Sequence, residues 1–398
     1  MQRILLRGGK VYTPNPNRQE NTILIENDKI TGIGSDISRD LPVDQVIDLP
    51  SQYAILPGMI DVHIHGAAGS DVMDSTSEAL TTIARTLPLE GTTSFLATTM
   101  TNPSSNIEQA LRNAAIYHQK NNHPGQAEMM GIHLEGPFIN QNRAGAQPTS
   151  SIIRPDVSTF KHYQSLANDL IKLVTLAPEL DDQSELTRYL YQNGMIASVG
   201  HSEANFVQLS HAVNLGIRHA THLFNGMNGL HHRDPGSAGA ILLNQNILAE
   251  IIVDGIHVSK EMVDLTYRLK GAEGLLLITD AMRAKCLNEG IYDLGGQEVE
   301  VKDHKAILKS SGSLAGSILK MNEAARNMLE FTHCSMYDLM KMTSENAAKE
   351  LGIWKRKGSI EVNKDADLIV VDEQMNVQLT ICRGQIAIDH FKRANSIS

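Results

Sequence analysis

The chain has 398 residues, of which 41% are hydrophobic and 20% charged, and its formal net charge at pH 7 is -10. This composition is ordinary for a globular protein, and the length suits two or three domains, or one large α/β barrel with an additional part. The acidic charge and the absence of a Lys/Arg-rich block argue against a nucleic-acid-binding protein. No apolar run has the length of a signal peptide or a membrane span, so we expect a cytoplasmic protein without membrane contact.

Both ends of the chain are rich in predicted β-strands. Residues 1–57 contain short stretches such as RILLRGGKVYT and NTILIEND, separated by Gly, Pro and Asn-Asp turns. From about residue 358 onward the sequence has the same character, with apolar and polar residues alternating between turns. Because a few strands cannot close a core alone, we predict that residues 1–57 and 355–398 form one small β domain beside a larger domain of residues 58–354.

The middle of the chain alternates short apolar runs with helical stretches, which is typical of a parallel sheet. Eight runs are candidate strands, at residues 59–64, 92–99, 127–135, 171–178, 195–201, 218–224, 248–254 and 274–280. Helices are predicted between them, for example over residues 77–90, 106–121, 181–194 and 203–216. Eight such units predict an α/β protein with a (β/α)8 barrel. An open doubly wound sheet is the alternative, although no Gly-rich phosphate-binding turn follows the first strand.

Polar residues gather where the predicted strands end, and in a barrel of this type the active site lies at the carboxyl ends of the strands. His63 and His65 end the first strand and share one face of it. The residues that end the third, fifth, sixth and eighth strands are Glu135, His201, His222 and Asp280. Imidazole nitrogen and carboxylate oxygen bind Zn²⁺, Fe²⁺ or Mn²⁺, and a shared carboxylate can bridge two ions. We therefore predict a metal centre, whereas any one of these residues alone would more simply be a hydrogen-bonded loop residue.

One further histidine lies close to this set in the sequence. His219 comes three residues before His222 on the same predicted strand. Side chains alternate between the two faces of a strand, so we expect His219 to face away from the site and to be structural.

The strand ends also carry a resemblance to known proteins. The stretches GMIDVHIHG, GIHLEGPF, SVGHSEA, ATHLFNGM, GSAGAILL, IIVDGIHV, LITDAM and SLAGS are similar to those of the amidohydrolase superfamily. Within it they resemble the N-acetylglucosamine-6-phosphate deacetylase family, over almost the whole chain. The resemblance implies a metal-bearing TIM-like barrel with a small β-sandwich formed by the two terminal segments. It also implies hydrolysis of N-acetyl-D-glucosamine 6-phosphate to D-glucosamine 6-phosphate and acetate, in amino-sugar catabolism or cell-wall sugar recycling.

The resemblance assigns roles to four of the strand-end residues. Glu135, His201 and His222 match the most strongly bound metal site of the family, which a water completes. Asp280 matches the residue that takes the proton of this water and passes it to the leaving amine nitrogen. Asp280 is therefore the predicted catalytic residue and also lies near the metal ligands.

The number of ions is left open at this point. His63 and His65, with Glu135 bridging and Asp280 nearby, could hold a second ion, but some family members lack the His-x-His pair and use one. We therefore expect one or two divalent ions (Zn, Fe or Mn) per subunit. Many other amidohydrolases bridge two metals with a carboxylated lysine at the end of the fourth strand. Here Lys172 lies near the beginning of that strand, which weakens a dihydroorotase or hydantoinase interpretation.

The acidic chain needs local positive groups to hold a phosphate. Arg233, in HHRDPGSAG, and His257, in DGIHV, are the candidates. In the family the residue matching Arg233 comes from the neighbouring subunit, so the resemblance implies a homodimer with shared active sites. The alternative for Arg233 is a solvated loop charge beside Asp234.

Other candidate substrate contacts come from loops. Asn225 and Gly226 match a family stretch whose backbone approaches the sugar, where a glycine permits close contact. Ala146 and Gln147 lie in the loop RAGAQP, and some family members have a histidine in place of Gln147, which leaves its role open. Leu314 lies in SLAGS, which resembles a family loop near the substrate.

Two other functions are compatible with these patterns. One is an amidohydrolase that acts on a cyclic amide or on a different acetamido sugar. The other is an inactive barrel that serves as a binding scaffold. Inactive relatives usually lose metal ligands or the catalytic carboxylate, whereas this chain keeps all six strand-end residues, which disfavours a scaffold.

Overall fold

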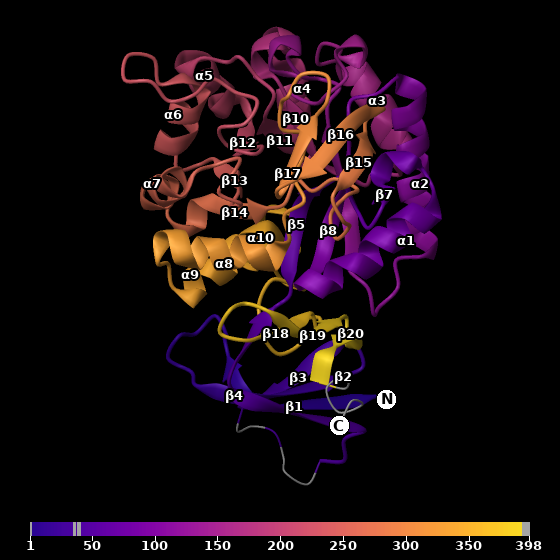
Figure 1. Cartoon of the computed structure of the whole chain (residues 1–398), viewed down its shortest axis with the longest axis vertical. Coiled ribbons are helices and arrows are strands. Elements are labelled where there is room, and N and C mark those ends of the chain that lie inside the picture. Colours follow the sequence, from indigo (N-terminus) through magenta and orange to yellow (C-terminus); the bar gives the residue numbers. More distant parts are fainter. Residues whose placement is uncertain (1, 35–36, 38–40, 392–398) are drawn as a thin grey trace.

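The larger part of the molecule is a parallel barrel, seen in the upper half of the computed structural model, which describes residues 2–34, 37 and 41–391 (Figure 1). Among these residues eight strands pair in parallel in chain order, from β5 to β14. They are β5 (Met59–Ile64), β8 (Thr92–Thr99), β9 (Glu128–Glu135), β10 (Ile171–Leu176), β11 (Ile196–Val199), β12 (Ile217–Ala220), β13 (Leu248–Ile252) and β14 (Leu275–Ile278). A backbone bridge between Ile64 and Ala281 brings the two ends of the sheet together, which confirms the predicted barrel.

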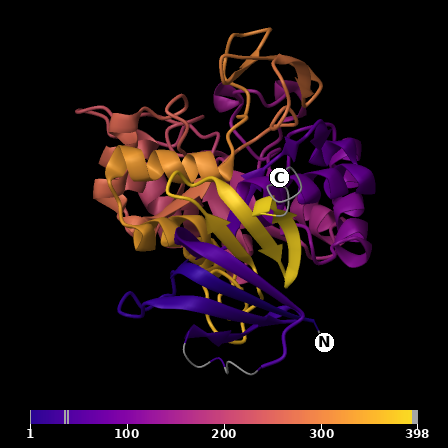
Figure 2. The same ribbon diagram turned by 60° about the horizontal axis from the view of Figure 1, so that its bottom comes forward.

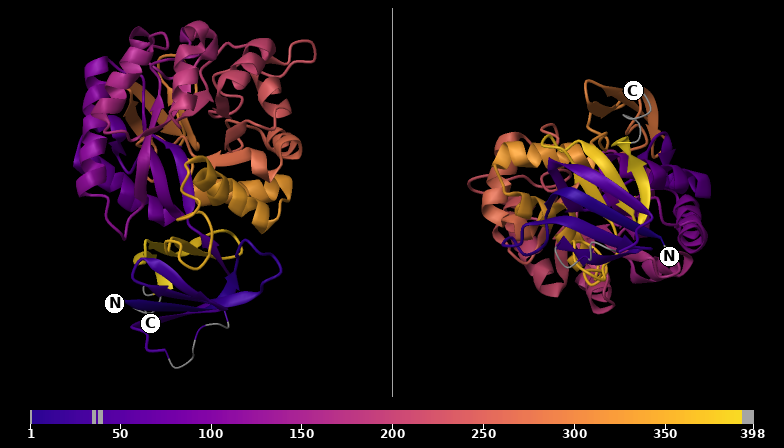
Figure 3. Two further views of the ribbon diagram at one scale, coloured as in Figure 1. Left: turned by 180° about the vertical axis from the view of Figure 1, so that it is seen from behind. Right: turned by 90° about the horizontal axis from the view of Figure 1, so that it is seen from below.

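Helices surround the barrel, as the front and back views show (Figures 1 and 3). The helices are α1 (Ser77–Thr86), α2 (Ser104–Lys120), α3 (Val157–Leu166), α4 (Glu185–Gln192), α5 (Phe206–Leu215), α6 (Gly236–Leu243), α7 (Lys260–Lys270), α8 (Met321–Thr332), α9 (Met336–Met340) and α10 (Asn346–Glu350). The local sequence determines where several of these helices begin. Asn205 caps α5, because its side chain accepts a hydrogen bond from the Gln208 backbone while the Gln208 side chain accepts one from the Asn205 backbone. No helix in the described ranges combines the length and apolar character needed to cross a bilayer.

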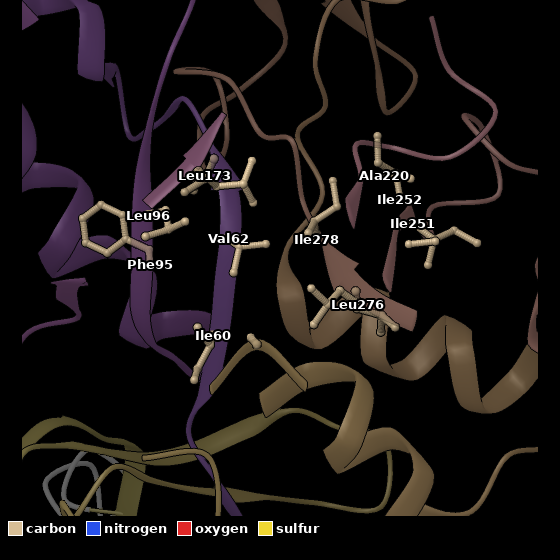
Figure 4. Packing of buried hydrophobic residues seen from close by; sticks show 14 of the residues in the cluster. Ile60, Val62, Phe95, Leu96, Leu173, Ala220, Ile251, Ile252, Leu276 and Ile278 are labelled. Carbon is tan, nitrogen blue, oxygen red and sulfur yellow. The ribbon is translucent and has the colours of Figure 1, made fainter. Parts of the chain in front are cut away.

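Alternation along the strands separates an apolar layer from a polar one. On β5, Ile60 and Val62 belong to the main apolar cluster (Figure 4), and burying each such side chain stabilises the fold by about 1.5–3 kcal/mol. Asp61 and His63 alternate with them, and both are buried with polar partners: Asp61 accepts a hydrogen bond from the Thr279 hydroxyl at 2.6 Å. The barrel interior is therefore polar near its carboxyl end, although its surroundings are apolar.

A chain of hydrogen bonds makes this polar interior rigid. His133 Nε2 lies 2.7 Å from the Thr175 hydroxyl, which lies 2.7 Å from that of Thr221, and Thr221 in turn lies 2.6 Å from the Ser198 hydroxyl. These four side chains come from β9, β10, β11 and the end of β12, so they tie neighbouring strands together. A fully connected buried network of this kind gives the strand ends above it a fixed geometry.

The terminal segments join in a smaller β-rich part below the barrel (Figures 1 and 2). In the described part of the chain its sheet has the order β20-β19-β18-β4-β1-β2-β3. The strands are β1 (Arg3–Val11), β2 (Glu20–Glu26), β3 (Lys29–Ile33), β4 (Gln45–Pro57), β18 (Leu368–Val371), β19 (Val377–Cys382) and β20 (Gln385–Asp389). The long strand β4 pairs with both β1 and β18, and one apolar cluster mixes Ile4 and Leu6 with Val370 and Leu379. The two ends of the chain therefore form one β-sandwich, as predicted.

The division of the chain into residues 1–57 plus 355–398 and residues 58–354 stays a prediction. The outermost residues of the smaller domain, Met1 and 392–398, lie outside the described residues.

Two short antiparallel elements after barrel strands were not predicted. After β5 the chain forms a small hairpin of β6 (Gly66–Ala67) and β7 (Ser70–Asp71), and after β14 it forms three strands, β15 (Gly290–Leu294), β16 (Gln297–Lys302) and β17 (Lys305–Leu308). The three-stranded element projects at the top of Figure 2 and has its own apolar cluster, which includes Leu294, Val299 and Met100. The Gly295-Gly296 turn and the alternation in QEVEVK were a usable signal for it.

Candidate active site

The structure brings all six predicted strand-end residues into one buried cluster at the carboxyl end of the barrel. His63 lies on β5 and Glu135 is the last residue of β9, whereas the other four come one or two residues after a strand end. Glu135 Oε1 lies 3.1 Å from His201 Nε2 and 3.2 Å from His222 Nε2. Asp280 Oδ1 lies 3.4 Å from His63 Nε2 and 3.2 Å from His65 Nε2.

Three of the six residues have a strained backbone. His201, His222 and Asp280 have φ values of 46°, 31° and 48°, in the left-handed region that non-glycine residues rarely adopt. Each such residue costs on the order of 1–3 kcal/mol and persists only where the surrounding structure enforces it. Here the left-handed backbone occurs at three residues whose side chains meet in the buried cluster.

Glu135, His201 and His222 have the geometry of a metal site. The two Nε2 atoms are 3.1 Å apart, so with Glu135 Oε1 the three ligand atoms form a nearly equilateral triangle. Bonds of about 2.0–2.1 Å to a tetrahedral ion place neighbouring ligand atoms roughly 3.3 Å apart, which fits. His201 Nδ1 lies 2.7 Å from the backbone oxygen of Arg143. Because a carbonyl can only accept, Nδ1 carries the proton and the lone pair of Nε2 faces the site.

His63, His65 and Asp280 form a second group that shares Glu135 with the first. Glu135 Oε1 lies 3.5 Å from His63 Nε2, and Glu135 Oε2 lies 3.3 Å from His65 Nε2. His63 Nε2 is completely buried and has no hydrogen-bond partner among the described residues. A buried nitrogen facing two carboxylates fits a cation, which would give it the partner that a buried polar atom requires. The residues present therefore fit a divalent ion at either group.

The charges of the cluster also favour a cation. Burial lowers the pKa of both His63 and His65, but nearby carboxylates outweigh it. Glu250, Asp280 and Glu135 raise the pKa of His63 well above its ordinary value, and Asp280 and Glu135 raise that of His65 to about 10. Burial raises the pKa of Glu135, but the imidazoles outweigh it and hold this pKa well below its usual range. A negative field that holds protons on imidazoles also attracts a divalent cation.

A third close grouping consists of His63, His133 and Glu250, and in it His133 has no free ligand atom. His133 Nδ1 lies 3.2 Å from the Val62 carbonyl oxygen, to which it donates, and its Nε2 lies 2.7 Å from the Thr175 hydroxyl. Burial lowers the pKa of His133 to about 3, so this imidazole is neutral and both of its nitrogens have partners. His133 is therefore part of the supporting network.

Glu250, on β13, was not among the predicted site residues. Its carboxylate contacts His63 Nδ1 at 2.8 Å and His219 Nε2 at 3.0 Å. A charged residue within the apolar run LAEII was the available signal, since buried parallel strands are otherwise continuously hydrophobic. The prediction that His219 faces away from the site is wrong, because His219 contacts the same carboxylate as His63 does. The expected alternation fails because β12 ends at Ala220 and the backbone of His222 is left-handed.

A cavity of about 140 Å³ opens beside the metal-ligand candidates. It contains most of the predicted substrate-contacting residues, namely Ala146, Gln147, Asn225, Gly226, His257 and Leu314. Residues that the sequence did not single out also line it, namely Met100, Gly145, Leu294 and Gly316. Two of these residues come from identifiable elements: Leu294 belongs to the three-stranded element β15–β17, and Met100 directly follows β8.

Gln147 contacts a metal-ligand candidate directly. Its Oε1 accepts a hydrogen bond from the Thr101 backbone at 2.7 Å, which orients the amide so that Nε2 donates to Glu135 Oε2 at 2.7 Å. The loop that carries it is held from the other side, because Gln297 of β16 donates to the Ala146 carbonyl at 2.7 Å. Gln147 therefore fixes the orientation of the Glu135 carboxylate.

His257 and Gly226 lie on other walls of the cavity. His257 Nδ1 lies 2.6 Å from Asp254 Oδ2, and although burial lowers the pKa of His257, this carboxylate outweighs it and raises the pKa. A charged imidazole at this position suits an anionic ligand. Gly226 has a φ of 62°, and a Cβ there would lie 3.1 Å from His201 Nδ1, so a larger residue would displace a metal-ligand candidate.

Arg233 and Lys172 lie outside the cavity. Arg233 is exposed in the loop before α6, where it contacts His232 Nε2 at 2.8 Å, so it does not reach the site of its own chain. Lys172 is exposed near the start of β10 and donates to the Asp169 carbonyl. It therefore lies at the end of the barrel opposite to the metal-ligand candidates, as the sequence predicted.

Comparisons with known proteins agree with this geometry. A model of the amidohydrolase family matches residues 54–387. An N-acetylglucosamine-6-phosphate deacetylase from Bacillus subtilis (strain 168) is 48% identical over 386 residues, which cover 96% of this chain and 97% of the relative. The crystal structure of the deacetylase of that name from Thermotoga maritima superposes with a TM-score of 0.85 at 33% identity, covering 97% of this chain and 99% of that one. A mutant of the deacetylase from Mycobacterium smegmatis, in complex with N-acetyl-D-glucosamine-6-phosphate, has a TM-score of 0.90 at 25% identity and covers 98% and 100%.

Proposed function

The chain belongs to the amidohydrolase family, and we infer that it hydrolyses the acetamido group of N-acetyl-D-glucosamine 6-phosphate to give D-glucosamine 6-phosphate and acetate. The observation that carries this function is the convergence of Glu135, His201 and His222, with Asp280 beside them, in a chain that is 48% identical to a deacetylase of this activity over almost its full length.

Glu135, His201 and His222 would hold one divalent ion, and His63, His65 and Asp280 would hold a second with Glu135 between the two. When bound, such an ion lowers the pKa of a water molecule and polarises the amide carbonyl. Nitrogen and oxygen ligands suit Zn, Fe and Mn alike. Elemental analysis of protein purified without added metal measures both the identity and the number of ions.

Asp280 would carry the proton during hydrolysis. The attacking water adds to the acetamide carbon, and one of its protons passes to the Asp280 carboxylate. The same carboxyl group then protonates the sugar nitrogen as the C–N bond breaks, so that acetate and a free amine leave. Charged imidazoles beside Asp280 lower its pKa although burial raises it, which keeps the group ionised and ready to accept a proton.

The walls of the cavity would position the sugar. Asn225 and the backbone at Gly226 lie next to His222 and would contact the sugar ring, whereas His257 offers positive charge to the phosphate. Ala146, Gln147 and Leu314 close the other sides, with Gln147 acting on the substrate through Glu135.

The phosphate would also need Arg233 from a second subunit. Arg233 lies exposed on the loop before α6, and exposed apolar side chains lie on both neighbouring helices and on the loop. Val207 on α5 is 74% exposed, Leu243 on α6 is 67% exposed, and Leu230 is 50% exposed. A homodimer would cover these side chains and bring Arg233 to the partner's cavity.

The expected cytoplasmic location stays a prediction.

Acetate release tests the substrate. The protein should release acetate from N-acetylglucosamine 6-phosphate far faster than from unphosphorylated N-acetylglucosamine, and dihydroorotate should not react. N-acetylgalactosamine 6-phosphate tests discrimination between acetamido sugars. Equal turnover with and without the phosphate would rule out the phosphate contacts, and turnover of dihydroorotate would favour a cyclic-amide hydrolase instead.

Mixing two inactive variants tests the shared site. Asp280→Asn subunits lack the proton carrier, and Arg233→Ala subunits lack the proposed phosphate contact. A mixed dimer contains one site with both wild-type residues, and free exchange of equal amounts of the two variants makes half of all dimers mixed. Mixing should therefore recover about a quarter of the wild-type activity. Failure to recover activity in dimers shown to be mixed would mean that each site is built from a single chain.

A further inference from the structure

Glu250 lies directly beneath the metal ligands, and no step of the proposed reaction uses it. Its carboxylate is completely buried. Oε2 contacts His63 Nδ1 at 2.8 Å and accepts a hydrogen bond from the His222 backbone at 3.1 Å, while Oε1 contacts His219 Nε2 at 3.0 Å. One carboxylate therefore contacts a residue of each ligand group, His63 of the second and His222 of the first, and His219 holds it from below.

The contact with Glu250 determines which nitrogen of His63 is available to an ion. A carboxylate at this position accepts the Nδ1 proton, so the lone pair of the neutral imidazole is on Nε2. Nε2 is the atom that faces Asp280 at 3.4 Å and Glu135 at 3.5 Å. The opposite tautomer would place a proton between these atoms, where an ion would otherwise lie.

The other histidine ligands do not have this support. His65 Nδ1 and His222 Nδ1 have no hydrogen-bond partner within the described part of the chain. His201 Nδ1 is held by the carbonyl oxygen of Arg143 and not by a carboxylate. The second ligand group therefore has a single imidazole of fixed tautomer, and Glu250 fixes it.

We propose that Glu250 is a positioning residue for the second metal ion, which holds His63 in the tautomer and orientation that let Nε2 bind a divalent cation. This inference rests on the proposed function only in assuming a metal-dependent hydrolase. The first ion would be held by Glu135, His201 and His222, with the Arg143 carbonyl behind His201. Of these residues only His222 contacts Glu250, through its backbone. Loss of the carboxylate should therefore weaken the second ion selectively.

Metal binding without substrate tests this directly. Chelator-treated wild-type protein and the variant Glu250→Leu are titrated with Zn²⁺ and with Co²⁺, by calorimetry and by the absorption bands of Co²⁺. The wild type should take two ions per chain. In Glu250→Leu the affinity of the second ion should fall about 10- to 100-fold, as is typical when the partner of a ligating histidine is removed, while the first stays within a few-fold. Unchanged affinities, equal weakening of both ions, or a wild type that binds one ion would overturn the proposal.

Glu250→Gln keeps the test meaningful if the leucine variant does not fold. A glutamine can place its carbonyl oxygen where Oε2 lies and so keep the bonds to His63 and to the His222 backbone. Its amide then faces His219 Nε2, which becomes an acceptor once the proton moves to Nδ1, 3.7 Å from Glu350 Oε1. Glu250→Gln should therefore fold and bind the second ion more tightly than His63→Ala, which lacks the ligand itself. A second-ion affinity of Glu250→Gln as weak as in His63→Ala would contradict the tautomer argument.

A matched control is available at another buried carboxylate. Glu90 is as buried as Glu250 and pairs with Lys285 at 2.6 Å, and neither residue belongs to a candidate ligand group. Glu90→Gln should leave both metal affinities unchanged. Acetate release is measured separately, so a protein that binds two ions through Glu250 but releases no acetate would refute the proposed substrate and leave this inference intact.

Discussion

Glu128 and Glu135 are the two end residues of strand β9, both are buried, and each lies among groups that can carry positive charge. Glu128, at the start of the strand, contacts Lys357 at 2.8 Å and Arg356 at 3.0 Å. Glu135, at the end of the strand, contacts only imidazole nitrogens, at 3.1–3.5 Å, and the side-chain amide of Gln147. Lysine and arginine keep their protons in a fixed ion pair, whereas imidazoles can exchange a proton for a metal ion. The first environment stabilises the fold, and the second can bind a cofactor.

The cluster around Glu128 joins the barrel to the β-sandwich. Lys357 also contacts Asp367, and Arg356 contacts Asp365 at 2.7 Å. Burial raises the pKa of Glu128, but Lys357 and Arg356 outweigh it and lower the pKa to about 2. Each buried carboxylate here thus has a permanent cation beside it, and this cluster needs no ligand to be satisfied.

Replacing Asp280 by Asn should have the largest effect on function. The amide cannot take a proton from water, so the rate should fall about 10²- to 10⁴-fold, the usual contribution of a positioned acid–base group. The volume and the polar contacts to His63 and His65 stay similar, so the free energy of unfolding should change little. Steady-state acetate release and denaturant unfolding measure the two properties. Activity within a few-fold of wild type would refute the assigned role.

Replacing Lys357 by Met should have the opposite pattern. The change leaves Glu128 and Asp367 buried without their common cation, which should lower the free energy of unfolding by about 3–5 kcal/mol. The metal content and kcat of the remaining folded protein should not change, because the cluster lies at the other end of β9. Denaturant unfolding measures the loss of stability.

The matched control for Lys357 is Lys309. Its side chain is 47% exposed and pairs with Glu298 on the surface at 3.1 Å. Lys309→Met should change the free energy of unfolding by less than about 1 kcal/mol. Similar losses in both lysine variants would show that the junction cluster contributes no more than a surface ion pair.

The residues of the site that the sequence predicts are those at or near the ends of the barrel strands. Because apolar runs mark the strands and barrel strands end at one face, residues such as His63 and Glu135 could be placed in one cluster from their positions alone. The same reasoning misjudged His219, since it assumes regular alternation and the backbone of His222 is left-handed. The partners of Gln147 and Glu250 were not predictable, because each comes from a different strand or loop and depends on packing across the barrel.

Quaternary contacts mark a second limit of sequence reasoning. Arg233 is exposed in the chain as described, and a pattern of residues in one chain does not reveal which surface a second chain would cover. The β15–β17 element was missed for a different reason. Its alternation was visible in the sequence, but it follows the eighth strand, where the barrel pattern was already complete.

Acid titration should distinguish the two ends of β9 by a smaller effect. The pKa of Glu128 is lowered to about 2 in the folded protein, below its ordinary value of 4.5. A lowered folded-state pKa stabilises the fold above the unfolded-state value, and this stabilisation is lost as the pH falls toward the folded-state value. The difference in the free energy of unfolding between wild type and Glu128→Gln should therefore be constant above about pH 5.5 and shrink by about 2–3 kcal/mol as the pH falls toward 2.

Release of a metal ion in acid would also lower the free energy of unfolding. The comparison with Glu128→Gln removes this contribution. Both proteins keep the same metal ligands at the opposite end of β9, so loss of an ion lowers their stabilities equally and cancels in the difference. Repeating the titration with excess chelator tests this cancellation. A difference curve that moves when chelator is added would mean that the two ends of the strand are coupled, and that Glu128 and Glu135 do not act as separate sites.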